Sequence, residues 1–175
     1  SETIDALKKL KDAKSLSDLA AKAADLPADA RVTLIEAVAS LSAAKDTDAR
    51  QKTRLNAILV AHAGPSEPSF RTRASALRGL GKLKDTDHLP LLLAAADADS
   101  QHDRVRQGAL EALGDMDAKE GVAVAIRHAL PGAYNRTRPI AIEALRKLAH
   151  HDPDAAYKIL AGLLTDRERR AWEAA

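Results

Sequence analysis

The chain of 175 residues contains no cysteine, and its aromatic residues are limited to one Trp, one Phe and two Tyr. The absence of cysteine excludes a disulfide-stabilised scaffold, a thiolate zinc site and a cysteine nucleophile. Aromatic and β-branched residues, which strands favour, are scarce, so a sheet-based fold is not expected. The chain instead contains 38 Ala and 24 Leu, both strong helix formers. Composition therefore predicts an all-α fold, built as one domain or as one run of repeats.

The sequence also lacks long apolar runs and an excess of charge of one sign. No apolar stretch approaches the roughly 20 residues of a membrane span, and we see no charged-then-apolar leader at the N-terminal end. The net charge is +2, and neither half resembles a basic tail for nucleic acid or anionic lipid. We expect no membrane span; composition names no compartment, and we favour the cytoplasm. Because the first residue is Ser1 rather than Met, we expect a processed chain or a part of a larger one.

An internal repeat is the main signal. Three copies align without gaps from Arg73, Arg106 and Arg138, with steps of 33 and 32 residues. Each copy has apolar residues 3, 4, 7 and 10 positions later, which form one face of an α-helix. These residues are Ala76, Leu77, Leu80 and Leu83, then Ala109, Leu110, Leu113 and Met116, then Ala141, Ile142, Leu145 and Leu148. An earlier copy starts at Arg31. The pattern predicts that this first helix of each repeat, the A helix, buries that face.

A second and shorter helix, the B helix, is predicted after each A helix. In the three regular repeats it is expected to begin at an aspartate that caps its first turn. These aspartates are Asp87, Asp117 (in a capping box with Glu120) and Asp152 (followed by Pro153). Ahead of the first repeat, residues 3–10 and 17–26 are predicted to form one more helical pair that lacks the arginine signature, as an end cap does.

The predicted organisation is a single repeat domain over residues 1–175. In order, it comprises N-terminal capping helices over 1–28, a first repeat over 29–64, regular repeats over 69–98, 102–131 and 135–165, and a partial terminal helix over 166–175.

Helix pairs that repeat Arg-x-x-Ala-Leu-x-x-Leu-Gly every 31–33 residues resemble the HEAT-like repeat family in its short bacterial form. The resemblance covers residues 29–175. It implies a right-handed α-solenoid of about four to five antiparallel helix pairs, with the B helices along the concave side. Gly79, Gly81 and Gly114, which fall inside A helices, are interpreted as points where neighbouring repeats approach closely.

Two runs, residues 100–110 and 131–141, are also similar to repeats in the helical C-terminal region of some bacterial zinc aminopeptidases. That region is an accessory domain, so the resemblance implies the role of an appended module. The zinc signature His-Glu-x-x-His does not occur in this sequence, and the catalysis of those enzymes is therefore not carried over.

The residues that could perform chemistry have a structural interpretation that we favour. His150, His151 and Asp152 could bind a metal ion only with a distant partner. The favoured interpretation is that the imidazoles end a helix and Asp152 caps the next one. No Gly-x-Gly-x-x-Gly or phosphate-loop lysine motif occurs. We therefore predict no catalytic residue, no metal and no cofactor, in a chain that is not an enzyme.

The repeated arginines are the most regular polar feature. If Arg73, Arg106 and Arg138 stack one per repeat, they could meet the phosphates of a nucleic acid. Few aromatic residues are available to stack on bases, and aspartates such as Asp103 and Asp117 are near in sequence. We therefore predict that these arginines pair with carboxylates across repeat interfaces and are structural.

The B helices of the middle repeats are apolar on more than one face. One explanation is that a B helix is flanked on two sides and needs a wide apolar stripe. The functional alternative is that Leu91 and Val124 expose apolar surface to a partner helix or peptide. The candidate partner-binding groove comprises His88, Leu91, Ala95, Val124, Arg127 and His128.

The predicted function is a non-catalytic helical-repeat scaffold or protein–protein interaction module that binds a protein or peptide. Two alternatives stay open: an accessory C-terminal domain of a bacterial zinc aminopeptidase, and a nucleic-acid-binding HEAT-like protein.

Overall fold

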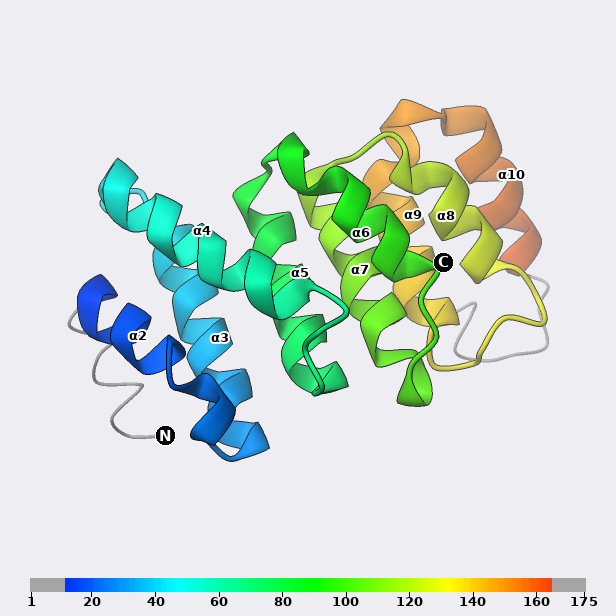
Figure 1. Ribbon diagram of the computed structural model, residues 1–175. Helices are drawn as coiled ribbons and strands as arrows, with labels where there is room; N and C mark the ends of the chain where they lie inside the picture. Colours follow the sequence, from blue (N-terminus) through cyan, green and yellow to red (C-terminus); the bar gives the residue numbers. More distant parts are fainter. Residues whose placement is uncertain (1–11, 165–175) are drawn as a thin grey trace.

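The computed structural model describes residues 12–164, which form helices and turns with no strand. Four A helices pack side by side in one layer (Figure 1). They are α3 (Ala28–Ser42), α5 (Phe70–Leu83), α7 (Arg104–Met116) and α9 (Arg138–Leu148). The B helices α4 (Ala49–Ala63), α6 (Leu89–Ala96), α8 (Gly121–Ala129) and α10 (Pro153–Leu163) pack against that layer. The prediction of an α-solenoid of stacked helix pairs is confirmed.

Each B helix from α4 to α8 packs mainly against the A helix of the following repeat: α4 on α5, α6 on α7 and α8 on α9. Helices α4 and α8 also contact the A helix of their own repeat, α3 and α7, as nearest-neighbour stacking in a solenoid requires. No helix within residues 12–164 has the length and apolar content needed to cross a membrane.

The N-terminal end differs from the prediction. Helix α2 (Ala13–Ala20) starts earlier than the expected segment 17–26, and only a 3₁₀ turn, η1 (Ala23–Asp25), follows it. Asp12 explains the early start, because its carboxylate accepts a hydrogen bond from Ser15 N and caps the helix. The predicted helix at 3–10 and the partial terminal helix at 166–175 lie outside the described residues.

Side-chain caps set the start of three further helices. Asp48 accepts from Gln51 N at 2.9 Å at the start of α4, and Ser69 accepts from Thr72 N at the start of α5. Asp152 accepts from Ala155 N at the start of α10, with Pro153 in the first turn, as predicted.

The predicted caps at Asp87 and Asp117 are wrong. Asp85 is the residue that caps η2 (Thr86–His88), and α6 then begins after His88 without a side-chain cap. Asp117 adopts the left-handed conformation, with φ of 65°, and ends α7, while α8 begins after Glu120. Because Asp117 ends the preceding helix, its carboxylate is not placed at the start of α8.

The predicted apolar face of the A helices is the core of the molecule. Leu77, Leu80, Leu110, Leu113, Ile142 and Leu145 are all fully buried, as are Ala76, Ala109 and Ala141 between them. The first copy is buried in the same way at Leu34, Ile35, Val38 and Leu41. Of the residues ten positions after the repeat arginine, Leu83 alone is only partly buried. The period of about 3.6 residues thus identified the buried face correctly.

Glycines allow the A helices to approach closely, as predicted for Gly79 and Gly81. A Cβ at Gly81 would lie 2.5 Å from the carbonyl oxygen of Ala112, and one at Gly79 would lie 2.8 Å from the Cβ of Ala39. Gly108, which the repeat pattern did not single out, has the same role against Ala74.

Candidate functional site

The repeat arginines Arg73, Arg106 and Arg138 share one contact. In each case Nε donates a hydrogen bond to the carbonyl of the last residue of the preceding B helix. The acceptors are Ala63 at 3.0 Å, Ala96 at 3.0 Å and Ala129 at 3.2 Å. The last carbonyls of a helix have no partner within that helix, so the arginine of the next repeat satisfies one of them.

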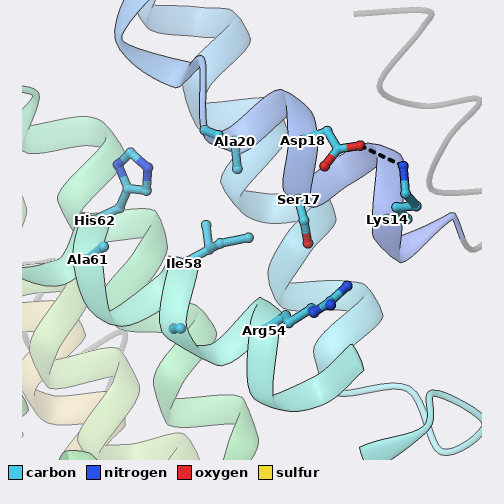
Figure 2. A pocket seen from close by; sticks show the side chains of 10 residues that line it. Lys14, Ser17, Asp18, Ala20, Arg54, Ile58, Ala61 and His62 are labelled. Carbon is cyan, nitrogen blue, oxygen red and sulfur yellow. Dashed lines mark hydrogen bonds and ion pairs between the residues drawn. The ribbon is translucent and has the colours of Figure 1, made fainter. Parts of the chain in front are cut away.

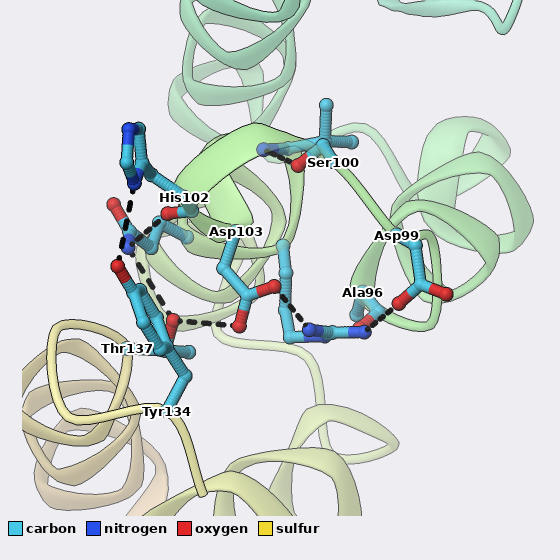
Figure 3. Close-up of polar contacts among 10 residues, drawn as sticks. Ala96, Asp99, Ser100, His102, Asp103, Tyr134 and Thr137 are labelled. Carbon is cyan, nitrogen blue, oxygen red and sulfur yellow. Dashed lines mark hydrogen bonds and ion pairs between the residues drawn. The ribbon is translucent and has the colours of Figure 1, made fainter.

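Arg106 makes two further contacts, with the carboxylates of Asp103 at 2.6 Å and Asp99 at 3.2 Å. The other oxygen of Asp103 accepts from the hydroxyl of Thr137, which belongs to the next repeat (Figure 3). Gln107 also donates to that hydroxyl. This network extends from the end of α6 through Arg106 to the segment that leads into α9.

The prediction that a repeat arginine pairs with a carboxylate is confirmed at Arg106, whereas the partner common to all three arginines is a backbone carbonyl. Within residues 12–164, Arg73 forms no ion pair with a carboxylate, and burial lowers the pKa of its guanidinium. Asp117, expected near an arginine, contacts two histidines instead. Arg138 is only 2% exposed, which leaves little of its guanidinium accessible to an external phosphate.

The predicted groove residues lie on α6, α8 and the turn before α6, but two of them are inaccessible. Ala95 is 0% exposed and Val124 is 7% exposed, so both belong to the core. The alternative in which Val124 is exposed is wrong, because α8 packs against α9 and is flanked by α6 and α10. Leu91 is partly buried and packs against the core cluster.

Of the three polar members of the predicted groove, Arg127 is exposed, whereas His88 and His128 are partly buried. Arg127 on α8 is exposed and forms an ion pair with Asp97 at the end of α6, at 2.9 Å. His128 and His88 each have a buried Nε2 without a hydrogen-bond partner. Burial, followed by the charges of Arg106 and Arg127, lowers the pKa of His128 and favours its neutral form.

Another hollow lies between α2 and α4, with a volume of about 730 Å³. Figure 2 shows Ile58 and Arg54 on α4 opposite Ser17 on α2. The hydroxyl of Ser17 is buried without a hydrogen-bond partner. Repeat analysis did not identify this hollow, because α2 carries no repeat signature.

His62, at the edge of this hollow, contacts a buried carboxylate. Its Nδ1 lies 2.6 Å from Oε2 of Glu67, and Oε1 of Glu67 accepts from Ser69 N. Arg31 approaches the same carboxylate at 3.7 Å. Glu67 thus holds the loop between α4 and α5 in place. In the sequence, only its position between Pro65 and Pro68 could have indicated this structural role.

Three residues with metal-ligating side chains lie close together at the turn between α7 and α8: Asp117, His150 and His151. The imidazoles of His150 and His151 both contact the carboxylate of Asp117, which supplies the distant partner that the sequence could not identify. Asp152 is not part of this cluster, because it caps α10.

The outer face of the B helices carries small apolar residues in successive repeats. Val60 on α4 is 38% exposed, and Ala94 on α6 and Ala123 on α8 are exposed. A second hollow, of about 600 Å³, lies beside Ala123 and is lined by Val122 and Ile126. This exposed surface, unlike Val124 and Ala95, is accessible to another molecule.

Comparison with protein families finds a match to the HEAT repeats family over residues 58–155. The matched segment runs from the middle of α4 to the start of α10 and includes all three repeat arginines. No curated protein matches the sequence. The similarity of two runs to the accessory region of zinc aminopeptidases therefore stays a prediction.

Proposed function

Since the chain belongs to the HEAT repeat family, we propose that it is a non-catalytic scaffold that binds a protein partner along the outer face of its B helices. HEAT repeats are commonly scaffold or interaction modules, and a solenoid offers an extended surface with one similar patch per repeat. The partner-binding surface that we assign comprises Val60, Leu91, Ala94, Ala123 and Ile126, with Arg127 at its rim.

The observation that carries this proposal is the repetition of exposed apolar residues on α4, α6 and α8. Val60, Ala94 and Ala123 are exposed and contribute little to the core, whereas Leu91 and Ile126 are partly buried and also pack against it. The occurrence of exposed apolar residues on three successive B helices favours a long partner, such as a helix or an extended segment, over a small molecule.

A nucleic-acid partner is less well supported. The repeat arginines donate Nε to backbone carbonyls, and Arg106 is also neutralised by Asp99 and Asp103. A polyanion track requires cations that are free to contact phosphates. Arg127, on the B-helix face, is itself paired with Asp97.

The test compares proteins that co-purify with the full chain and with two variants. Ala94→Glu with Ala123→Glu places two charges on the proposed surface without changing the core. The matched control is Ser40→Glu, on the exposed face of α3. We expect a reproducible partner that the wild type and Ser40→Glu retain and that the double variant loses. A partner retained by the double variant would place the binding surface elsewhere, and a partner released by nuclease treatment would favour nucleic acid.

A further inference from the structure

Three side chains with metal-binding donors meet where the turn after α7 contacts the turn after α9. Asp117 ends α7, and His150 and His151 lie in the 3₁₀ turn η4 (Ala149–His151). The Nε2 atoms of His150 and His151 lie 3.1 Å and 3.0 Å from Oδ1 of Asp117. One ligand atom from each residue lies within 4.8 Å of the others. The cluster thus combines donors from two consecutive repeats.

We propose that Asp117, His150 and His151 bind a divalent transition-metal ion, and that Zn²⁺ is the ion this donor set fits best. Imidazole nitrogen with carboxylate oxygen suits Zn²⁺, whereas Mg²⁺ and Ca²⁺ prefer oxygen ligands throughout. Three protein ligands of this kind leave one position of a tetrahedral ion for water.

Two of the three donor separations fit such an ion, and the third is within 4.8 Å. Bonds of about 2.0–2.1 Å to a tetrahedral ion place neighbouring ligand atoms about 3.3–3.4 Å apart. The two Nε2 to Oδ1 separations are only a few tenths of an ångström shorter. The imidazole rings are 4.1 Å apart between centroids and tilted by 38°, so they are not locked in a flat stack. His150 is largely exposed and is free to make the small adjustment.

The backbone holds the carboxylate in place. Asp117 has a left-handed conformation, and its N–H donates to the carbonyl of Leu113. This conformation ends α7 and leaves the Asp117 side chain against η4, since its carboxylate and its carbonyl both lie 3.0 Å from Nε2 of His151. The donors are therefore brought together before an ion arrives, which lowers the entropy lost on binding.

Coordination through Nε2 requires the single proton of each neutral imidazole to be on Nδ1. Without an ion, Nε2 of His151 lies within hydrogen-bond distance of Asp117, and Nε2 of His150 contacts the same carboxylate oxygen. The ion then replaces these contacts with bonds to all three residues. It would tie the turn of one repeat to that of the next, 34 residues further on for His151.

The experiment uses the full chain without a histidine tag, freed of metal by a chelator, with Zn²⁺ as the probe. Titration calorimetry gives the stoichiometry and the dissociation constant, and circular dichroism gives the melting temperature with and without Zn²⁺. The variants are Asp117→Asn, His150→Ala and His151→Ala. The matched control is His102→Ala, which removes an exposed histidine one repeat earlier.

We expect one Zn²⁺ per chain, bound much more tightly than Mg²⁺. Each ligand variant should weaken binding by about 100-fold or more, since changes outside the ligand set alone cost about 10–100-fold. At 100 times the dissociation constant, Zn²⁺ should raise the melting temperature of the wild type and of His102→Ala by roughly 5–10 °C.

The proposal is wrong if the wild type binds no Zn²⁺, or if the three ligand variants bind it as tightly as the wild type. It is also wrong if Mg²⁺ binds equally well. His150→Ala keeps the result interpretable, because this side chain is the most exposed of the three and its loss should leave the helical spectrum unchanged.

Discussion

The interface between α5 and α7 and the next one, between α7 and α9, use equivalent repeat positions but pack differently. Gly81 and Gly114 both lie eight residues after a repeat arginine. A Cβ at Gly81 would overlap the backbone of Ala112, whereas one at Gly114 would lie 3.3 Å from Cα of Ala144. At this position of the repeat, the α5–α7 interface has no room for a side chain, whereas the α7–α9 interface would bring a Cβ only into close contact.

The α7–α9 interface, where the glycine packs less closely, has additional polar contacts. Lys147 on α9 forms an ion pair with Asp115 on α7 at 2.6 Å, and Thr137 donates to Asp103. The α5–α7 interface also has an ion pair, between Arg78 and Glu111, but backbone-to-backbone packing dominates it. The comparison indicates that the repeat pattern determines which helices pack together, while the distance between two A helices depends on the particular residues at their interface.

Leu110→Ala should have the largest effect, because Leu110 lies on α7 and α7 belongs to both interfaces. Its side chain is fully buried, and its truncation is expected to cost about 2–5 kcal/mol in the free energy of unfolding. Urea denaturation followed by circular dichroism measures this cost. A cost below about 1 kcal/mol would mean that the site collapses around the smaller side chain and that α7 is not the common element of the two interfaces.

Gly81→Ala against Gly114→Ala tests the comparison directly. At Gly81 the methyl group meets the backbone of Ala112, and we expect a loss of about 1–3 kcal/mol. At Gly114 its nearest neighbour is Cδ of the Lys147 side chain, at 3.2 Å, rather than backbone. The gain in helix propensity, about 0.5–1 kcal/mol, then offsets most of the contact. Equal losses in the two variants, measured as differences in the midpoint of denaturation, would remove the distinction between the interfaces.

Arg106→Ala and Arg138→Ala should cost less than Leu110→Ala, because each leaves the last carbonyl of the preceding B helix without its partner. We expect about 1–3 kcal/mol for each. Retention on a heparin column should change little, since these guanidinium groups are already engaged. A variant that keeps its stability but elutes at lower salt would identify a phosphate contact instead.

The exposed ion pairs should have the smallest effects. Arg78 with Glu111 and Lys147 with Asp115 are all partly exposed, so each pair should contribute about 1 kcal/mol or less. Double-mutant cycles with alanine measure the two coupling energies. A coupling for Lys147 with Asp115 well above that of the other pair would show that the α7–α9 interface depends on its polar contacts.

The fold and the buried face of the A helices could be predicted from the sequence, whereas the contacts between repeats could not. Leu110 follows a period that any amphipathic helix must have, and its burial was predicted correctly. Asp117 looked like a cap because aspartate before a helix usually is one, but the left-handed turn that it adopts depends on how α7 ends. Val124 was expected to be exposed because a sequence shows that a residue is apolar but not which neighbour covers it.

The hydrogen bonds of the repeat arginines also bear on the order in which the molecule folds. Each one joins residues only 9 or 10 positions apart, and closing a loop of about 10 residues takes roughly 10–100 ns. Contacts that are local in sequence form at a low entropic cost and are associated with fast folding. A B helix and the A helix after it can therefore associate before more distant repeats meet. We therefore expect the pair that spans two repeats, such as α6 with α7, to form before the pair within one repeat.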